Sequence, residues 1–99
     1  MLYAIIAEDI PDSAEKRKAA RPEHLKRIEQ LVGEGRILIA GPFPAIDSPD
    51  PGSAGVTGSL IVGEFESLED ATNWINNDPY VTEGVFASVK VTPFLKTVP

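Results

Sequence analysis

The sequence contains a single histidine, His24, and no cysteine. An imidazole is the side chain that most readily accepts and returns a proton near neutral pH, so His24 is the first candidate for acid–base chemistry. The lack of cysteine excludes thiolate nucleophiles and Cys-ligated zinc, and one histidine does not build a multi-histidine metal site. The chain also has no nucleophile elbow and no glycine-rich phosphate loop. We therefore expect no metal and no cofactor, and proton transfer on a small organic substrate remains.

Asp78 is the candidate partner of this histidine. It precedes a proline, which favours an extended backbone at the aspartate, so the carboxylate can project from the end of the helix predicted before it. A carboxylate that binds one imidazole nitrogen fixes the tautomer and leaves the other nitrogen free as an acid or base. We predict that Asp78 orients His24, because two helices that run side by side can bring the start of one close to the end of the other.

Basic residues concentrate in the segment that holds His24. Residues 1–36 contain seven of the nine lysines and arginines together with seven acids, whereas residues 37–99 contain eight acids and two lysines. Arg21 and Arg17 lie about one and two helical turns before His24, so either guanidinium can hold an anionic group such as a carboxylate. Three further side chains offer hydroxyl groups that can orient a substrate: Thr57, Ser59 and Tyr80.

Each of these residues also has a structural interpretation. A histidine on an apolar helix face is often a core residue with one nitrogen bonded to a carbonyl, and an aspartate before proline often only forms a turn. Three hypotheses follow. The chain is an enzyme that uses His24 and Asp78, a non-catalytic module that binds a small acidic metabolite in the same cleft, or an accessory dimer in which His24 is structural.

The composition narrows the function classes. A net charge of −6 argues against nucleic-acid binding, because that requires a basic face to displace counterions. No apolar run approaches the roughly 18 residues of a membrane span, and Met1 leads into a strand-like segment without the basic start of a signal peptide. We therefore expect a cytoplasmic protein that binds neither membrane nor nucleic acid.

Apolar periodicity and turn residues predict four strands, at residues 2–7, 36–41, 59–65 and 85–95. Two helical segments lie between them in the order βαββαβ. This order, without an internal repeat or a linker, predicts one domain over residues 1–99. Its expected architecture is an α+β sandwich in which an antiparallel sheet carries both helices on one face.

The first helical segment is expected in two pieces. Asp12 and Glu15 have the spacing of a capping box, so a helical turn can start at Asp12. Pro22 then interrupts the helix, because proline lacks an N–H and restricts the residue before it. The main helix is therefore predicted over residues 22–34, with Gly35 as its left-handed stop.

The main helix is predicted to be amphipathic, with His24 on its apolar face. His24 is thereby expected in the first turn, near an end where a cleft can open. Four residues at helical spacing share that inward face: Leu25, Ile28, Leu31 and Val32. Lys26 and Arg27 fall at or beyond its edge, where water is expected.

The second helix is predicted to begin at the cap Ser67, with Asp70 at its third position, and to end before Pro79. Its core-facing residues are expected to be Leu68, Ala71, Trp74 and Ile75.

The segment 41–58 contains four prolines and four glycines and is predicted to be a long loop. Loops of this length in compact domains are usually functional or mobile, so we interpret it as a candidate lid.

The strands at residues 2–7 and 37–40 are apolar at both parities. In a sandwich with helices on one face, the other face would then need a second cover. A second copy of the chain is the natural cover, and we predict a homodimer packed sheet to sheet.

The whole chain resembles the YciI family of small bacterial proteins. The resemblance rests on Leu-Tyr-Ala-Ile-Ile-Ala at the start, Arg21-Pro22-Glu23-His24-Leu25, Gly41-Pro42, Asp-Pro-Gly at residues 50–52, Phe65-Glu66-Ser67-Leu68 and Asp78-Pro79-Tyr80. It implies a ferredoxin-like fold, a dimer of the dimeric α+β barrel type and an active site centred on a His/Asp pair, which maps to His24 and Asp78. Related dimeric barrels include isomerases, monooxygenases and lyases, so we expect isomerase, lyase or dehydrochlorinase-like chemistry on a small anionic substrate.

Overall fold

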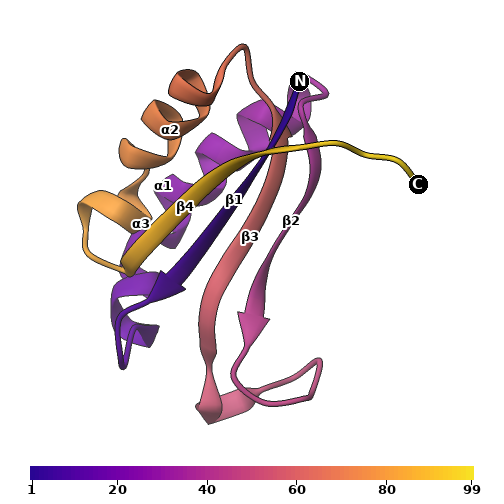
Figure 1. Cartoon of the computed structure of the whole chain (residues 1–99). Helices are drawn as coiled ribbons and strands as arrows, with labels where there is room; N and C mark the ends of the chain where they lie inside the picture. The colour runs from indigo at the N-terminus through magenta and orange to yellow at the C-terminus, as the bar shows by residue number, and fades with distance from the viewer.

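The computed structural model describes all residues, 1–99, and contains one antiparallel sheet with helices on one side (Figure 1). Its strands are β1 (Leu2–Asp9), β2 (Ile37–Pro44), β3 (Val56–Glu64) and β4 (Phe86–Phe94). Its helices are α1 (Ala14–Gly33), α2 (Leu68–Asn76), the short α3 (Pro79–Thr82) and the 3-10 turn η1 (Gly52–Ala54). The predicted ferredoxin-like α+β fold with the element order βαββαβ is confirmed.

The sheet has the strand order β2-β3-β1-β4, and every neighbouring pair is antiparallel. Residues directly opposite one another share a face, so Ile5, Ile61 and Val91 lie together towards the helices. Twelve buried residues form the core between sheet and helices, and Ile5, Ala71, Ile75 and Val85 are among its least exposed members. The helices are thereby fixed against the sheet.

The helix α1 is continuous from Ala14 to Gly33, so the predicted break at Pro22 is wrong. Residues on both sides of the proline, Ala20 and His24, are buried against the rest of the molecule. Packing along the helix outweighs the cost of an interior proline, which is about 3 kcal/mol for the lost hydrogen bond and the ring clash together. His24 therefore lies in the middle of α1, whereas the sequence predicted the first turn.

No helix of the structure combines the length and the apolar character that crossing a bilayer requires.

The two ends of α1 can be compared with the predicted start and stop of the helix. Asp12 does not cap the helix: it has a positive φ of 56°, and Ser13 occupies the N-cap position without a capping hydrogen bond. Instead Ser13 donates to Asp9, the last residue of β1. At the other end Gly35 adopts φ 71°, as predicted for a left-handed stop.

The inward face of α1 is narrower than its apolar pattern predicts. Leu31 is buried and Ile28 packs against the core, but Val32 is 56% exposed. The second helix shows the same effect, because Ala71 and Ile75 are fully buried while Leu68 is 45% exposed. Both exposed residues lie at a helix end: Val32 is the next-to-last residue of α1, and Leu68 is the first residue of α2.

The predicted cap of α2 is confirmed, since the Ser67 hydroxyl accepts a hydrogen bond from the backbone N–H of Asp70 at 3.0 Å. The sequence did not predict α3, the single turn that follows. Asp78 caps this turn and Pro79 occupies its first position, which is where proline fits a helix best.

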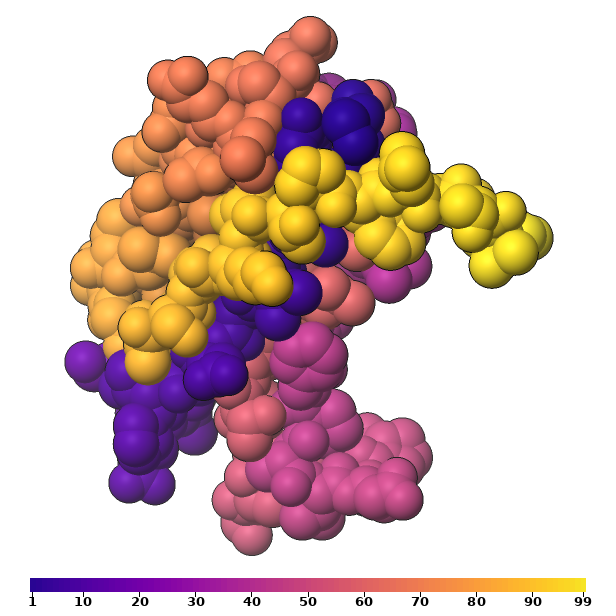
Figure 2. Space-filling model, in the orientation of Figure 1, coloured from indigo at the N-terminus to yellow at the C-terminus, as the bar shows by residue number.

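The strands β2 and β3 extend into the segment that was predicted as a loop. They run to Pro44 and from Val56, which leaves residues 45–55 as the connection. Figure 2 shows this hairpin end as a projection, separated from the start of α1 by a notch. The lid hypothesis stays a prediction, but the base of the hairpin belongs to the candidate functional site.

Candidate functional site

The structure brings His24 and Asp78 together, although 54 residues separate them in the chain. The imidazole Nδ1 lies 2.7 Å from the carboxylate Oδ2. Asp78 is fully buried and His24 is 8% exposed. A buried carboxylate accepts the proton on Nδ1, which places the lone pair of a neutral imidazole on Nε2.

The local sequence explains how Asp78 reaches the histidine. Pro79 holds Asp78 in an extended conformation with ψ 141°, as predicted, so the side chain turns back over α3. There Oδ2 also accepts a hydrogen bond from the backbone N–H of Tyr80 at 3.0 Å. The carboxylate is therefore both the cap of a helical turn and the partner of an imidazole.

Tyr80 packs directly on the histidine. Its ring and the imidazole are stacked, with centroids 3.9 Å apart and planes at 7°. Burial raises the pKa of the Tyr80 phenol, while the nearby Arg17 and Arg21 guanidinium groups partly oppose this shift. The phenol therefore stays protonated, and available as a hydrogen-bond donor, through neutral pH.

Arg27 completes the surroundings of Asp78. Its Nη1 donates to Asp78 Oδ1 at 2.8 Å, and its Nη2 donates to the backbone oxygen of Trp74 at the same distance. The guanidinium also lies over the Trp74 ring, 4.6 Å from its centroid. The sequence placed Arg27 towards water, whereas the structure makes it the counter-ion of the buried carboxylate.

A cavity of about 250 Å³ opens beside His24. Nδ1 is engaged with Asp78, and no hydrogen bond is formed by Nε2. Every fully buried side-chain nitrogen has a partner, so Nε2 is open to this cavity. The apolar part of its wall comes from α1 and the sheet: Leu25, Ile28, Ala40, Pro42 and Ile61.

Arg21 lines the same cavity and is exposed. It forms no salt bridge, in contrast to Arg17, Arg27 and Arg36. Its charge is therefore free to pair with an anion that enters the cavity beside His24.

Arg17 also reaches the cavity, but its guanidinium is largely occupied. Its Nε donates to the buried Asp9 carboxylate at 2.6 Å. Its Nη2 donates to Asp9 Oδ1, the Gly58 oxygen and the Ser59 hydroxyl at 3.0, 3.1 and 2.9 Å. Arg17 thus fixes the position of Ser59 on the cavity wall. Thr57, the third hydroxyl residue predicted from the sequence, is exposed and does not line this cavity.

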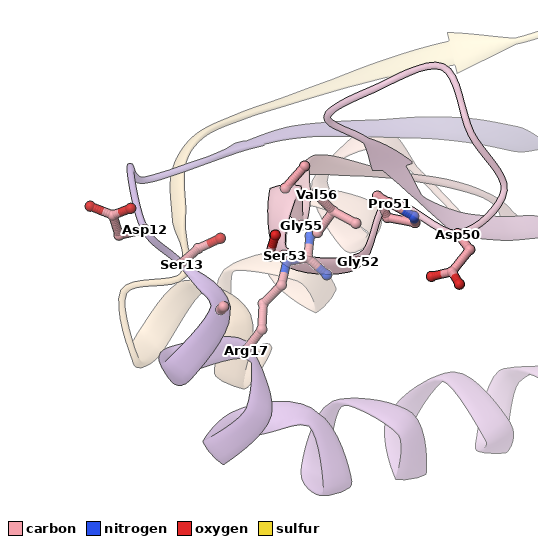
Figure 3. Close-up of a pocket in the computed structure, with 11 residues that line it drawn as sticks. Asp12, Ser13, Arg17, Asp50, Pro51, Gly52, Ser53, Gly55 and Val56 are labelled. Atoms are coloured by element: carbon pink, nitrogen blue, oxygen red, sulfur yellow. The ribbon is translucent and has the colours of Figure 1, made fainter.

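A second, larger hollow of about 490 Å³ lies on the other side of Arg17. Figure 3 shows Arg17 extending from α1 towards Gly55 and Val56, with Asp12 pointing away from the arginine. This hollow contains neither His24 nor Asp78. We place the candidate site in the smaller cavity, because only that one combines an open imidazole nitrogen with an unpaired cation.

Two residues of the site were missed by sequence reasoning, Arg27 and Asp9. A signal for Arg27 existed: it follows His24 by three residues, so the two share a helix face, and a buried aspartate requires a cation. Asp9 ends a strand, and nothing in its local sequence indicates a partner eight residues later. No group of three or more His, Asp or Glu side chains is arranged to hold a metal ion.

Comparison with known proteins shows the family of this chain. The family model described as the YCII-related domain matches residues 1–95. Protein YciI of Escherichia coli O6:H1 is 57% identical over 96 residues, covering 97% of this chain and 98% of its own length. A Haemophilus influenzae protein is 52% identical over 96 residues, with the same coverage of both chains.

Among solved structures, similarity extends to a 5-chloro-2-hydroxyhydroquinone dehydrochlorinase from Burkholderia phenoliruptrix, determined in complex with 2,5-dihydroxybenzoquinone. The two chains are 28% identical with a TM-score of 0.84, over 96% of this chain and 94% of the other.

Proposed function

The chain belongs to the family of the YCII-related domain, and from that premise we propose that it is an enzyme that transfers a proton on a small anionic organic substrate. His24 is the acid–base residue and Asp78 orients it. Arg21 holds the negative charge of the substrate, while Ser59 and Tyr80 offer hydroxyl groups to it. Arg17 acts on Ser59 and does not bind the substrate through a free guanidinium.

One observation carries this proposal. The imidazole is fixed from Nδ1 by a buried carboxylate, and its Nε2 faces a cavity of about 250 Å³ that Arg21 also lines. A histidine that serves only the core usually has both ring nitrogens bonded to protein groups, whereas the second nitrogen here opens on a cavity that a substrate can enter. The open nitrogen therefore favours acid–base chemistry over the structural hypothesis.

The cavity also limits the substrate. Sites for drug-sized ligands measure roughly 300 to 1,000 Å³, so this one suits a smaller molecule, of about one ring. The similar dehydrochlorinase acts on a chlorinated, hydroxylated ring. Loss of hydrogen chloride from carbon requires a base that removes a proton, and Nε2 of His24 is the base that we assign to this step. We propose isomerase, lyase or dehydrochlorinase-like chemistry on small anionic molecules of about one ring.

The test is a panel of small hydroxylated ring acids, phenols and chlorinated phenols, incubated with the protein in D2O. We expect deuterium incorporation or product formation by NMR, falling by about 10²-fold or more in His24→Ala. Lys26→Met, an exposed substitution on the same helix, is the control. Turnover in His24→Ala within a few-fold of the wild type would contradict the proposal. A compound that raises the melting temperature without reacting would favour the binding module instead.

We also propose that the protein is a cytoplasmic homodimer. The sheet face opposite the helices carries Ile6, Ile39 and Phe94, which are 38%, 53% and 39% exposed. A second sheet packed on this face would remove these side chains from water. Light scattering should give twice the mass of the chain, and Ile39→Asp should return it to a monomer.

A further inference from the structure

Asp78 is an ionisable group with no access to water, and three donors converge on it. The side chain is fully buried, and its oxygens meet the His24 imidazole, the Tyr80 backbone N–H and the Arg27 guanidinium. His24 and Tyr80 share Oδ2, whereas Arg27 holds Oδ1. A neutral imidazole and an amide cannot compensate a buried negative charge. The only cation in contact with this carboxylate is Arg27.

Arg27 is itself held firmly in place. Its Nη2 donates to the Trp74 backbone oxygen, which belongs to the last turn of α2, and its guanidinium packs over the Trp74 ring. Its side chain is 27% exposed, so its charge is partly shielded from water. Arg27 belongs to α1, and its guanidinium contacts both α2 and Asp78, so it fixes the carboxylate relative to α1 and α2.

The position of this cation affects the histidine as well as the aspartate. A carboxylate next to an imidazole favours the protonated ring, and a cation on the opposite oxygen weakens that attraction. The two ionisable groups are therefore coupled through the charge of a third residue. Other charged groups near His24 are Arg21 and Arg17, which line the same cavity, and Arg17 is already paired with Asp9.

We propose that Arg27 is a positioning residue for the His24–Asp78 pair. It holds the carboxylate in place beside Nδ1, and its positive charge opposes the attraction of that carboxylate for a protonated ring. This role rests on the proposed acid–base function, but it makes a claim about proton binding that requires no substrate.

The test is an NMR titration of the imidazole nitrogens and carbon-bound protons in Arg27→Met, Arg27→Gln, Arg27→Lys and Lys26→Met. Met keeps the aliphatic stem over Trp74, Gln keeps a donor for Oδ1, and Lys keeps the charge. Lys26 is the matched control, because it lies next to Arg27 on the same helix, is 72% exposed and carries the same charge.

We expect the pH of half-protonation of the imidazole to rise by about one unit in Arg27→Met and Arg27→Gln relative to the wild type. Arg27→Lys should stay closer to the wild type than either, and Lys26→Met should match it. If Arg27→Met does not fold, the titration of Arg27→Gln decides the test. Coincident titrations in the wild type and both uncharged variants would overturn the proposal, as would an equal shift in Lys26→Met.

Asp78→Asn separates this proposal from the proposed function. If the imidazole titrates identically in Asp78→Asn and in the wild type, the His24–Asp78 pair itself is wrong. If Asp78→Asn shifts the titration and the Arg27 variants do not, only the role of Arg27 fails.

Discussion

The ring of Tyr80 lies parallel to the imidazole of His24 at 3.9 Å, and the backbone N–H of the same tyrosine binds the carboxylate of Asp78. One residue thus contacts both members of the pair, by its side chain on one and by its main chain on the other. The stack closes one face of the imidazole. The lone pair on Nε2 lies in the plane of the ring, so a proton that it accepts must come from that direction. The buried Tyr80 phenol also makes the folding stability depend on pH.

The first prediction concerns the stability of the wild type and Tyr80→Phe at alkaline pH. Burial raises the pKa of the Tyr80 phenol above its ordinary value of 10.0. Above that value the unfolded chain loses the phenol proton while the folded chain keeps it, so folded protein binds more protons and stability falls as pH rises. The wild type should therefore lose stability relative to Tyr80→Phe above about pH 10. Urea unfolding at several pH values measures this, and a constant difference between the two proteins would contradict it.

Replacement by methionine should affect folding stability at Arg17 but not at Arg21. Arg21 has no salt bridge, so Arg21→Met should leave the free energy of unfolding within about 0.5 kcal/mol and weaken binding of an anionic ligand by tenfold or more. Arg17→Met leaves the buried Asp9 without its cation and should cost about 3 to 5 kcal/mol. Thermal unfolding and calorimetric titration give both values. Equal loss of stability in the two variants would exclude this division of roles between the arginines.

Asp78 should be among the most sensitive positions of the chain. Asp78→Ala removes the cap of α3 and leaves Arg27 without its counter-ion, so the free energy of unfolding should fall by about 3 to 5 kcal/mol. Ser67→Ala is the comparison, because it removes only a helix cap at an exposed site, at about 1 kcal/mol. Denaturant unfolding tests both variants. Similar losses in the two would show that Asp78 acts only as a cap.

Gly58 should tolerate no side chain. A Cβ at this position would overlap the backbone oxygen of Ala7 on the neighbouring strand, and the Gly58 oxygen also accepts a hydrogen bond from Arg17. Gly58→Ala should therefore destabilise the protein by about 2 kcal/mol or more. Gly41→Ala is the matched control in the sheet, because nothing lies within 4 Å of its added Cβ. Equal melting temperatures for the two variants would contradict this account.

The sequence predicted the order of elements and the pairing of His24 with Asp78, since apolar periodicity, caps and an Asp-Pro step are local signals. It failed where distant packing decides the outcome. The proline at position 22 was interpreted as a break because its cost is local, while the compensation from Ala20 and His24 is tertiary. Arg27 was placed in water because its partner, Asp78, lies on another element. The stripe on α1 also did not reveal that Val32 faces solvent.

Pro22 provides the last prediction. It is exposed in the interior of α1 and has no N–H to donate to the carbonyl of Lys18, four residues earlier. Pro22→Ala restores that donor and a strong helix former, but it also gives the unfolded chain more freedom, which offsets up to about 1 kcal/mol. We expect a net gain of about 1 to 2 kcal/mol in the free energy of unfolding. A loss of stability would mean that the geometry of α1 depends on Pro22. The distance between His24 and Asp78 would then also depend on this proline.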